Sequence, residues 1–132
     1  MGLDATRGLD HTRLTVAAGP LLGPVLARVI AIHASRSDLP VDRVNDALLI
    51  ADAVAARAPS QVDDGRVAVT VQSLPGRLEV RVGPLRSGGA ERLLAGAALP
   101  QGERVVERLA DDVKTRETSG GREVLVLHIN AA

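Results

Sequence analysis

The chain has 132 residues, the usual size of one domain, and 45% of them are apolar, so one hydrophobic core is expected. It contains no Phe, Tyr or Trp, so the core must be aliphatic and no ring is available to stack on a nucleic-acid base. Sixteen basic and sixteen acidic residues cancel, which argues against nucleic acid or an acidic membrane surface as a partner. The absence of cysteine excludes disulfides, thiolate nucleophiles and cysteine-based metal sites.

The N-terminal residues predict a leader and no export signal. Residues 1–11 follow no period and include two glycines, which predicts a mobile leader before a single domain over residues 12–130. The start of the chain is not basic and then apolar, and no segment approaches the roughly 20 apolar residues that a membrane helix needs. We therefore expect a cytoplasmic protein that does not associate with membranes.

The first half of the chain predicts a strand and two helices. Over residues 12–17 the spacing puts Leu14 and Val16 on one face, as in a short strand. Residues 21–36 carry apolar side chains at helical spacing, which predicts the first helix. Pro40 suits the opening position of a second helix. The apolar stripe of that helix is Val44, Ala47, Leu48, Ala51, Val54 and Ala55.

Two alternating segments follow and predict a β-hairpin. Residues 66–72 and 77–83 alternate apolar and polar side chains on either side of a turn containing Pro75 and Gly76. The side chains expected to face the core are Val67, Val69, Val71, Leu78, Val80 and Val82. Those expected to face solvent are Thr70, Glu79 and Arg81.

The last third of the chain predicts two helical segments and a closing strand. Residues 90–96 favour one or two helical turns, and both Leu93 and Leu94 should be buried. Over residues 99–113 a loop ending in Gly102 precedes an amphipathic helix, whose apolar stripe is Val105, Val106, Leu109 and Val113. Residues 122–129 predict a strand in the middle of its sheet.

This order of elements predicts an α+β fold. The expected architecture is a two-layer sandwich in which a mixed, mostly antiparallel sheet carries helices on one face.

Known catalytic and metal-binding patterns are missing from the sequence. His11, His33 and His128 are far apart and have no carboxylates at ligand spacing, so no metal site is predicted. No serine lies in a Gly-x-Ser-x-Gly elbow, and neither the P-loop nor the dinucleotide-binding glycine pattern occurs. These patterns therefore give no support for hydrolase chemistry or for the common phosphate loops.

The layout and several segments nevertheless resemble a known family. The segments that carry the likeness are LPVDRVNDALLIADAVAARA (39–58), GRLEVRVGP (76–84), GERVVERLADDV (102–113) and GGREVLVLHI (120–129). Over residues 14–129 the chain resembles the GHKL, or Bergerat-fold, ATPase domain in the compact form of the anti-sigma regulatory factors. Those factors are serine/threonine kinases of bacterial partner-switching systems. The resemblance implies a Bergerat-like sandwich and a nucleotide site beside the second helix.

The resemblance also assigns catalytic positions on that helix. In the family a Glu acts as general base, and an Asn one turn later orders Mg²⁺ against the phosphates. Asp52 falls at the Glu position and Ala56 at the Asn position. Ala56 offers no oxygen to a cation that requires an octahedron of oxygens. Asp52 is one methylene shorter than Glu, which withdraws its carboxylate by roughly 1.5 Å.

Two further family positions have also lost their usual residues. Gly83 stands where the family has an Asp that accepts a hydrogen bond from adenine. Gly102 ends a lid that reads Pro100, Gln101, Gly102 in place of Gly-x-Gly. The resemblance therefore implies a degenerate site: Asp52 as a vestigial base, inactive nucleotide-binding positions at Ala56, Gly83 and Gly102, and neither metal nor cofactor.

The function predicted from these substitutions is protein binding without ATP. The expected partner is an anti-anti-sigma factor or a sigma factor, and the expected process is regulation of transcription. The alternative is an active kinase that binds ATP and Mg²⁺, in which Asp52 replaces Glu as the base and a partner serine receives the phosphate. A third hypothesis is a structural domain whose helices serve self-association, as in a homodimer.

Overall fold

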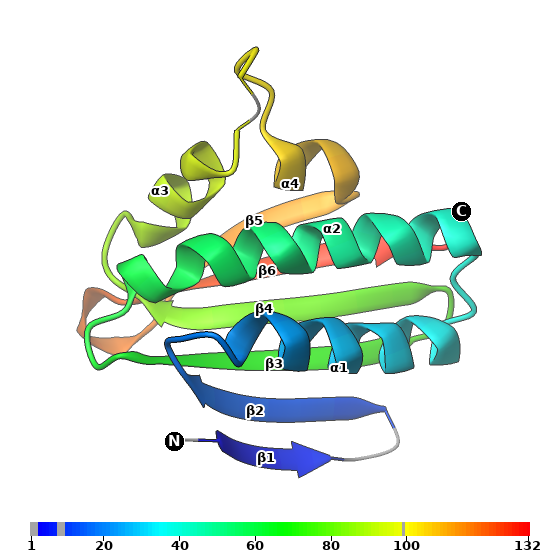
Figure 1. The fold of residues 1–132 in the computed structure, drawn as a ribbon, viewed down its shortest axis with the longest axis horizontal. Helices are drawn as coiled ribbons and strands as arrows, with labels where there is room; N and C mark the ends of the chain where they lie inside the picture. The colour runs from blue at the N-terminus through cyan, green and yellow to red at the C-terminus, as the bar shows by residue number, and fades with distance from the viewer. Residues whose placement is uncertain (1–2, 8–9, 99) are drawn as a thin grey trace.

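A computed structural model of the chain describes residues 3–7, 10–98 and 100–132, which form a two-layer α+β sandwich (Figure 1). One layer is a six-stranded sheet in the order β1-β2-β3-β4-β6-β5, and all five pairings between these strands are antiparallel. The strands are β1 (Leu3–Arg7), β2 (His11–Ala17), β3 (Arg66–Leu74), β4 (Arg77–Leu85), β5 (Asp112–Glu117) and β6 (Glu123–Asn130). The predicted fold class, with helices on one face of the sheet, is confirmed.

The second layer consists of helices, and the two long ones run side by side across the sheet (Figure 1). The helices are α1 (Leu22–Arg36), α2 (Val41–Arg57), α3 (Gly89–Gly96) and α4 (Val105–Leu109), with short 3-10 turns η1 (Ala58–Gln61) and η2 (Ser119–Gly121). Pro40 is the residue directly before α2, and its fixed φ is suited to the start of a helix. The predicted helices over 21–36, from 40 and over 90–96 are confirmed.

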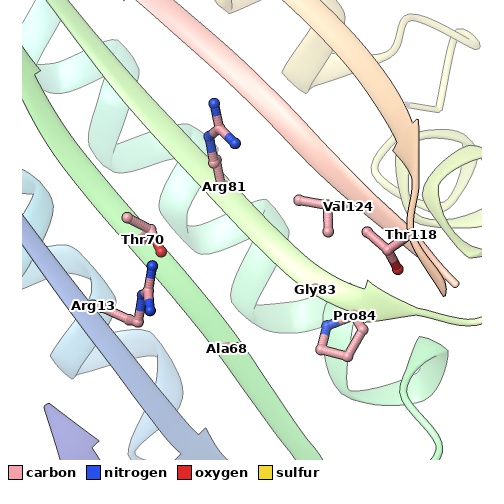
Figure 2. Close-up of a pocket in the computed structure, with 8 residues that line it drawn as sticks. All are labelled: Arg13, Ala68, Thr70, Arg81, Gly83, Pro84, Thr118 and Val124. Atoms are coloured by element: carbon pink, nitrogen blue, oxygen red, sulfur yellow. The ribbon is translucent and has the colours of Figure 1, made fainter.

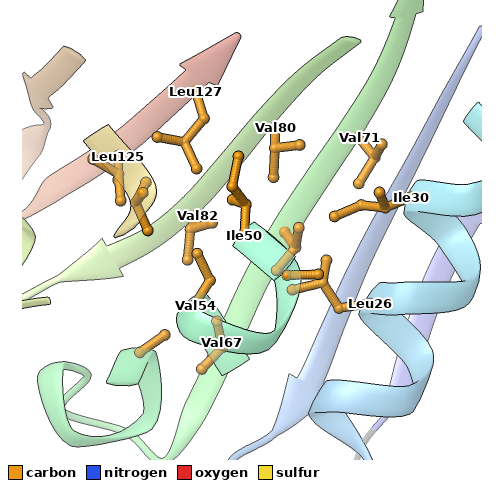
Figure 3. Close-up of a cluster of buried hydrophobic side chains, with 14 of the residues drawn as sticks. Leu26, Ile30, Ile50, Val54, Val67, Val71, Val80, Val82, Leu125 and Leu127 are labelled. Atoms are coloured by element: carbon orange, nitrogen blue, oxygen red, sulfur yellow. The ribbon is translucent and has the colours of Figure 1, made fainter. Parts of the chain in front are cut away.

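The core between the layers is aliphatic, as the composition requires (Figure 3). Leu26 and Ile30 of α1 and Ile50 and Val54 of α2 are at most 1% exposed. They face the buried side chains of the hairpin and β6. All six residues that were predicted to face the core from the hairpin are at most 1% exposed, and Leu93 and Leu94 are also buried. Each fully buried aliphatic side chain contributes about 1.5–3 kcal/mol.

A buried polar cluster joins α1 to the sheet. His33 of α1 is fully buried, and its Nε2 lies 2.8 Å from Oγ1 of Thr12 in β2. Its Nδ1 lies 2.5 Å from Oγ of Ser73 in β3. Both ring nitrogens are therefore hydrogen-bonded, as burial of an imidazole requires, and His33 has a structural role.

The N-terminal segment differs from the prediction. Residues 3–7 form β1, which pairs with β2 from Leu3 opposite Val16 to Arg7 opposite Thr12. The expectation of a leader without regular structure is therefore wrong for these residues. The edge of β2 supplies the backbone partners, so this strand needs no apolar alternation of its own. Residues 1–2 and 8–9 of the predicted leader lie outside the described residues.

The segment after Gly102 also differs from the prediction. Its helix ends at Leu109, and Asp112–Glu117 form β5, so the helix predicted as far as Val113 is wrong beyond Leu109. Val113 instead packs against the core from β5, opposite Leu127. The reason is the free edge of β6, whose backbone groups pair with residues 112–117. Residue 99, where the predicted loop begins, lies outside the described residues.

Candidate functional site

The outer face of α2 carries the residues predicted at the general-base and magnesium positions. Asp52 and Ala56 are one helical turn apart and both are exposed, so the structure brings these two positions together. The carboxylate of Asp52 makes no hydrogen bond or ion pair with any other residue that the structure describes. It therefore has neither a hydrogen-bond donor to orient it nor a side-chain oxygen beside it at position 56.

Gly83, predicted at the adenine-binding position, lies within β4 and is buried. A Cβ atom at this position would lie 2.9 Å from the carbonyl oxygen of Glu123 and 3.2 Å from Cγ2 of Val124. Strand alternation turns this position away from the helices, because its neighbour Val82 faces the core. Gly83 therefore faces the side of the sheet that the helices do not cover, and the structure does not bring it near Asp52.

Gly102 lies in the exposed loop between α3 and α4. Its φ of +90° is in the region that favours glycine. The base of the loop is closed by the Ala98–Arg104 bridge and by the Val105 N–H, which donates to the Ala97 carbonyl over 3.1 Å. Gly102 thus permits a turn, and no atom lies within 4 Å of the position its Cβ would take.

An apolar hollow of about 300 Å³ lies between α2 and α4, and we name it the α2–α4 groove. Its lining is Leu49 of α2 together with Glu103, Val105, Arg108 and Leu109. Leu49 is 53% exposed, and Glu103 and Arg108 form an ion pair at the groove. The groove is therefore an exposed aliphatic surface bordered by one charge of each sign.

Arg43 of α2 holds the end of α4 in place. Its guanidinium donates to the Leu109 carbonyl over 3.2 Å, to the Asp111 carboxylate over 2.5 Å and to the Asn130 carbonyl over 3.0 Å. The same Asp111 carboxylate accepts the Asn130 N–H over 2.7 Å. One side chain thus ties α2 to the α4–β5 junction and to the end of β6.

Arg104 joins the two helices on either side of the loop. It donates to Glu91 of α3 over 2.5 Å and to Glu107 of α4 over 2.9 Å. The hydrogen bond from Arg104 holds the pKa of Glu91 below its ordinary value of 4.5. The loop that carries Gly102 is therefore anchored at the start of α4.

The opposite face of the sheet has a hollow of its own, of about 370 Å³ (Figure 2). Arg13, Thr70 and Arg81 lie directly opposite one another on β2, β3 and β4. The alternation of the hairpin predicts Thr70, Glu79 and Arg81 toward solvent, but Glu79 is only 9% exposed, because His128 and Arg81 pack against it. The outward direction of Arg13 could also be predicted, because Arg13 alternates with the buried Leu14 just as Arg81 alternates with Val82.

A carboxylate–imidazole cluster lies beside that hollow. Nε2 of His128 is 2.9 Å from Glu79, and its Nδ1 is 3.3 Å from Asp112. Burial raises the pKa of Glu79, but hydrogen bonds from His128 and Arg81 outweigh it, so the pKa lies below 4.5. Burial also raises the pKa of Asp112, but the hydrogen bond from His128 and the charge of Lys114 outweigh it, so this pKa lies below 3.8.

Comparisons with known proteins add no family. No protein-family model matches this chain, and a search of curated proteins finds no match. The family resemblance therefore stays a prediction. Within the described ranges no three His, Asp or Glu side chains are grouped so that they could hold a metal ion. No helix among the described residues has both the length and the apolar character that a membrane crossing requires.

Proposed function

We propose that this protein is a cytoplasmic regulatory module that acts by binding another protein, and that it derives from anti-sigma factors of the GHKL type without using ATP. The observation that carries the proposal is the α2–α4 groove, where Leu49 is 53% exposed beside Val105 and Leu109. An exposed aliphatic surface of this kind is typical of protein-binding sites.

The side chains at the predicted nucleotide positions support binding without ATP. Position 56 offers no oxygen to Mg²⁺. At position 83 a Cβ atom would lie only 2.9 Å from the Glu123 carbonyl oxygen, which leaves no room for the aspartate that would accept a hydrogen bond from adenine. Each lost charged hydrogen bond removes about 1.5–3 kcal/mol, so two such losses remove much of a micromolar affinity.

The partner we propose is an anti-anti-sigma factor or a sigma factor. The groove fits one or two aliphatic side chains of an amphipathic helix, the usual form in which a helix binds a hydrophobic groove. The ion pair of Glu103 and Arg108 gives that helix one positive and one negative group to meet. Transcription would then be regulated by which partner occupies the groove.

Calorimetry with Mg-ATP and Mg-ADP tests the part of the proposal that concerns nucleotide. We expect no saturable binding tighter than about 100 μM. Saturable binding below that concentration, with phosphate transfer to a partner serine that Asp52→Ala abolishes, would instead establish the kinase alternative.

Pairwise binding to purified sigma and anti-anti-sigma factors tests the groove. Leu49→Glu places a charge in the apolar lining, so we expect at least tenfold weaker binding, which corresponds to about 1.4 kcal/mol. Val41→Glu is the matched control, because Val41 is 74% exposed on the same helix but does not line the groove. Equal loss in both variants, or binding by neither class of factor, would contradict the proposal.

A further inference from the structure

Three polar side chains form a row across the open face of the sheet. Arg13 is paired with Thr70, and Thr70 with Arg81, on three adjacent strands. Neighbouring strands lie about 4.8 Å apart, so the two arginine backbones are about 10 Å apart with a threonine hydroxyl between them. Figure 2 shows all three side chains on the same side of the sheet, with the Arg13 guanidinium beside Thr70.

Most of the donors in this row have no protein partner. The guanidinium of Arg13 makes no hydrogen bond or ion pair with the residues that the structure describes. Arg81 donates one hydrogen bond, from Nε to the Glu79 carboxylate over 3.1 Å, and its two terminal nitrogens donate none to the described residues. Two planar guanidinium groups with unused N–H donors are suited to an oxyanion.

The next row of the sheet makes the hollow beside the arginines. Ala68 and Gly83 form its floor with almost no side chain, while Pro84 and Val124 border it (Figure 2). Gly83 cannot be larger, because a Cβ would lie 2.9 Å from the Glu123 carbonyl. Packing of β4 against β6 therefore keeps the hollow open.

The charge around the hollow is positive. Its lining contains two arginines and no carboxylate. Glu79 accepts a hydrogen bond from Arg81 over 3.1 Å and lines the neighbouring, smaller hollow of about 240 Å³, which shares Arg13, Thr70 and Arg81. On β5, Lys114 and Arg116 lie opposite Val126 and Val124, so two further basic residues extend the two rows, and Lys114 also lies 3.5 Å from the Asp112 carboxylate. Between β2 and β5 these two rows therefore favour an anion.

We propose that this hollow binds a small organic phosphate, with the phosphate group between Arg13 and Arg81. A row of donors on three strands can serve three oxygens of a tetrahedral anion, whereas a planar carboxylate has only two oxygens. The hollow of about 370 Å³ is larger than a free phosphate needs, and its floor of Ala68 and Gly83, bordered by Pro84, is available to the aliphatic or sugar part of the ligand. The chain has no Phe, Tyr or Trp to stack on a base, so we expect a ligand without a nucleobase.

Titration of ¹⁵N-labelled protein, followed by NMR, tests the site directly. The probes are glycerol 3-phosphate, ribose 5-phosphate, inorganic phosphate and neutral glycerol. We expect saturable shifts of amides in β2, β3 and β4 with both esters, several-fold weaker binding of inorganic phosphate, and none of glycerol. If inorganic phosphate bound as tightly as the esters, the floor of the hollow would not bind the organic part of the ligand, and that part of the proposal would be wrong. No saturable shift, or shifts at the α2–α4 groove alone, would overturn the site.

Variants that remove one positive charge test whether Arg13 and Arg81 bind the phosphate group. Arg13→Gln and Arg81→Gln should each weaken ester binding about tenfold or more, since each removes a charged hydrogen-bond donor. Arg28→Gln is the matched control, because Arg28 is exposed on α1 in the other layer. An equal effect of Arg28→Gln would mean that net charge alone attracts the anion and would refute the site. Leu49→Glu should leave ester binding unchanged, which separates this site from the proposed protein-binding function.

Discussion

The absence of a side chain at Gly83 allows β4 to pack against β6 and also keeps the hollow on the open face of the sheet empty. Gly83→Asp would force β4 away from β6, since its Cβ would lie 2.9 Å from the Glu123 carbonyl and 3.2 Å from Val124. We expect the free energy of unfolding to fall by about 1–3 kcal/mol, measured by urea denaturation, with no gain of Mg-ATP binding. Gly19→Asp is the control, because no atom lies within 4 Å of a Cβ there. A Gly83→Asp protein that is as stable as wild type and binds ATP would refute this account.

The Glu79 carboxylate gives the molecule a defined dependence on pH. Its pKa in the folded protein is below 4.5, because hydrogen bonds from His128 and Arg81 outweigh burial. A lowered pKa stabilises the fold above the ordinary value, and this contribution is lost as the pH falls through the folded pKa. Wild type should therefore have a higher free energy of unfolding than Glu79→Gln at pH 7, and this difference should become smaller below about pH 4.5. Urea denaturation at several pH values measures it.

The matched control for that experiment is Glu117→Gln. Glu117 is exposed at the end of β5, and its carboxylate has no hydrogen-bond partner among the described residues. Its difference from wild type should stay within about 0.5 kcal/mol across the same pH range. A Glu79→Gln difference that is constant or grows on acidification would show that the hydrogen bonds to His128 and Arg81 do not favour the charged carboxylate.

Among the elements, the junction of α4 and β5 depends most on a single residue. Arg43 contacts the Leu109 carbonyl, the Asp111 carboxylate and the Asn130 carbonyl. Arg43→Ala leaves these acceptors without their partner, so we expect unfolding to become easier by about 1–3 kcal/mol. Arg28→Ala, on the exposed side of α1, should change stability by less than about 0.5 kcal/mol. Equal effects of the two variants, measured by urea denaturation, would contradict a specific role of Arg43.

Local patterns in the sequence predict those elements that carry their own signal. The alternation over residues 66–72 and 77–83 specifies β3 and β4, and the helical spacing over 21–36 specifies α1. By contrast, β1 and β5 exist because the edges of β2 and β6 offer backbone partners. Asp111 illustrates the difference, since its N–H donates to the His128 carbonyl, far away in sequence. A reading of residues 105–113 alone favours one continuous helix.

The candidate sites follow the same distinction. Asp52 and Ala56 are one turn apart on a single helix, so the sequence predicts that they share a face. Thr70 and Arg81 belong to one predicted hairpin, but the pairing of Arg13 with Thr70 depends on the register of two strands more than fifty residues apart, which no local pattern contains. The α2–α4 groove likewise depends on how the two helices pack.

For the whole molecule, the order of the strands divides the sheet into a protected centre and two edges. β2, β3, β4 and β6 each pair on both sides, and their inward side chains are buried under the helices (Figure 1). β1 and β5 pair on one side only, and the last four residues of β5 are exposed. Opening an edge strand therefore breaks one ladder and exposes little of the core.

Native-state hydrogen exchange measures this division. Amides of β3, β4 and β6 should exchange only through global unfolding, so their opening free energies should agree with one another. A substitution in the core should lower all of these opening free energies by the same amount. Ile50→Ala, which removes a fully buried side chain, should lower them by about 2–5 kcal/mol. Amides of β5 should open at lower free energy and change less, because local opening of this edge leaves Ile50 in place. If β5 were as protected as β6, the six strands would unfold as one unit and this division would be wrong.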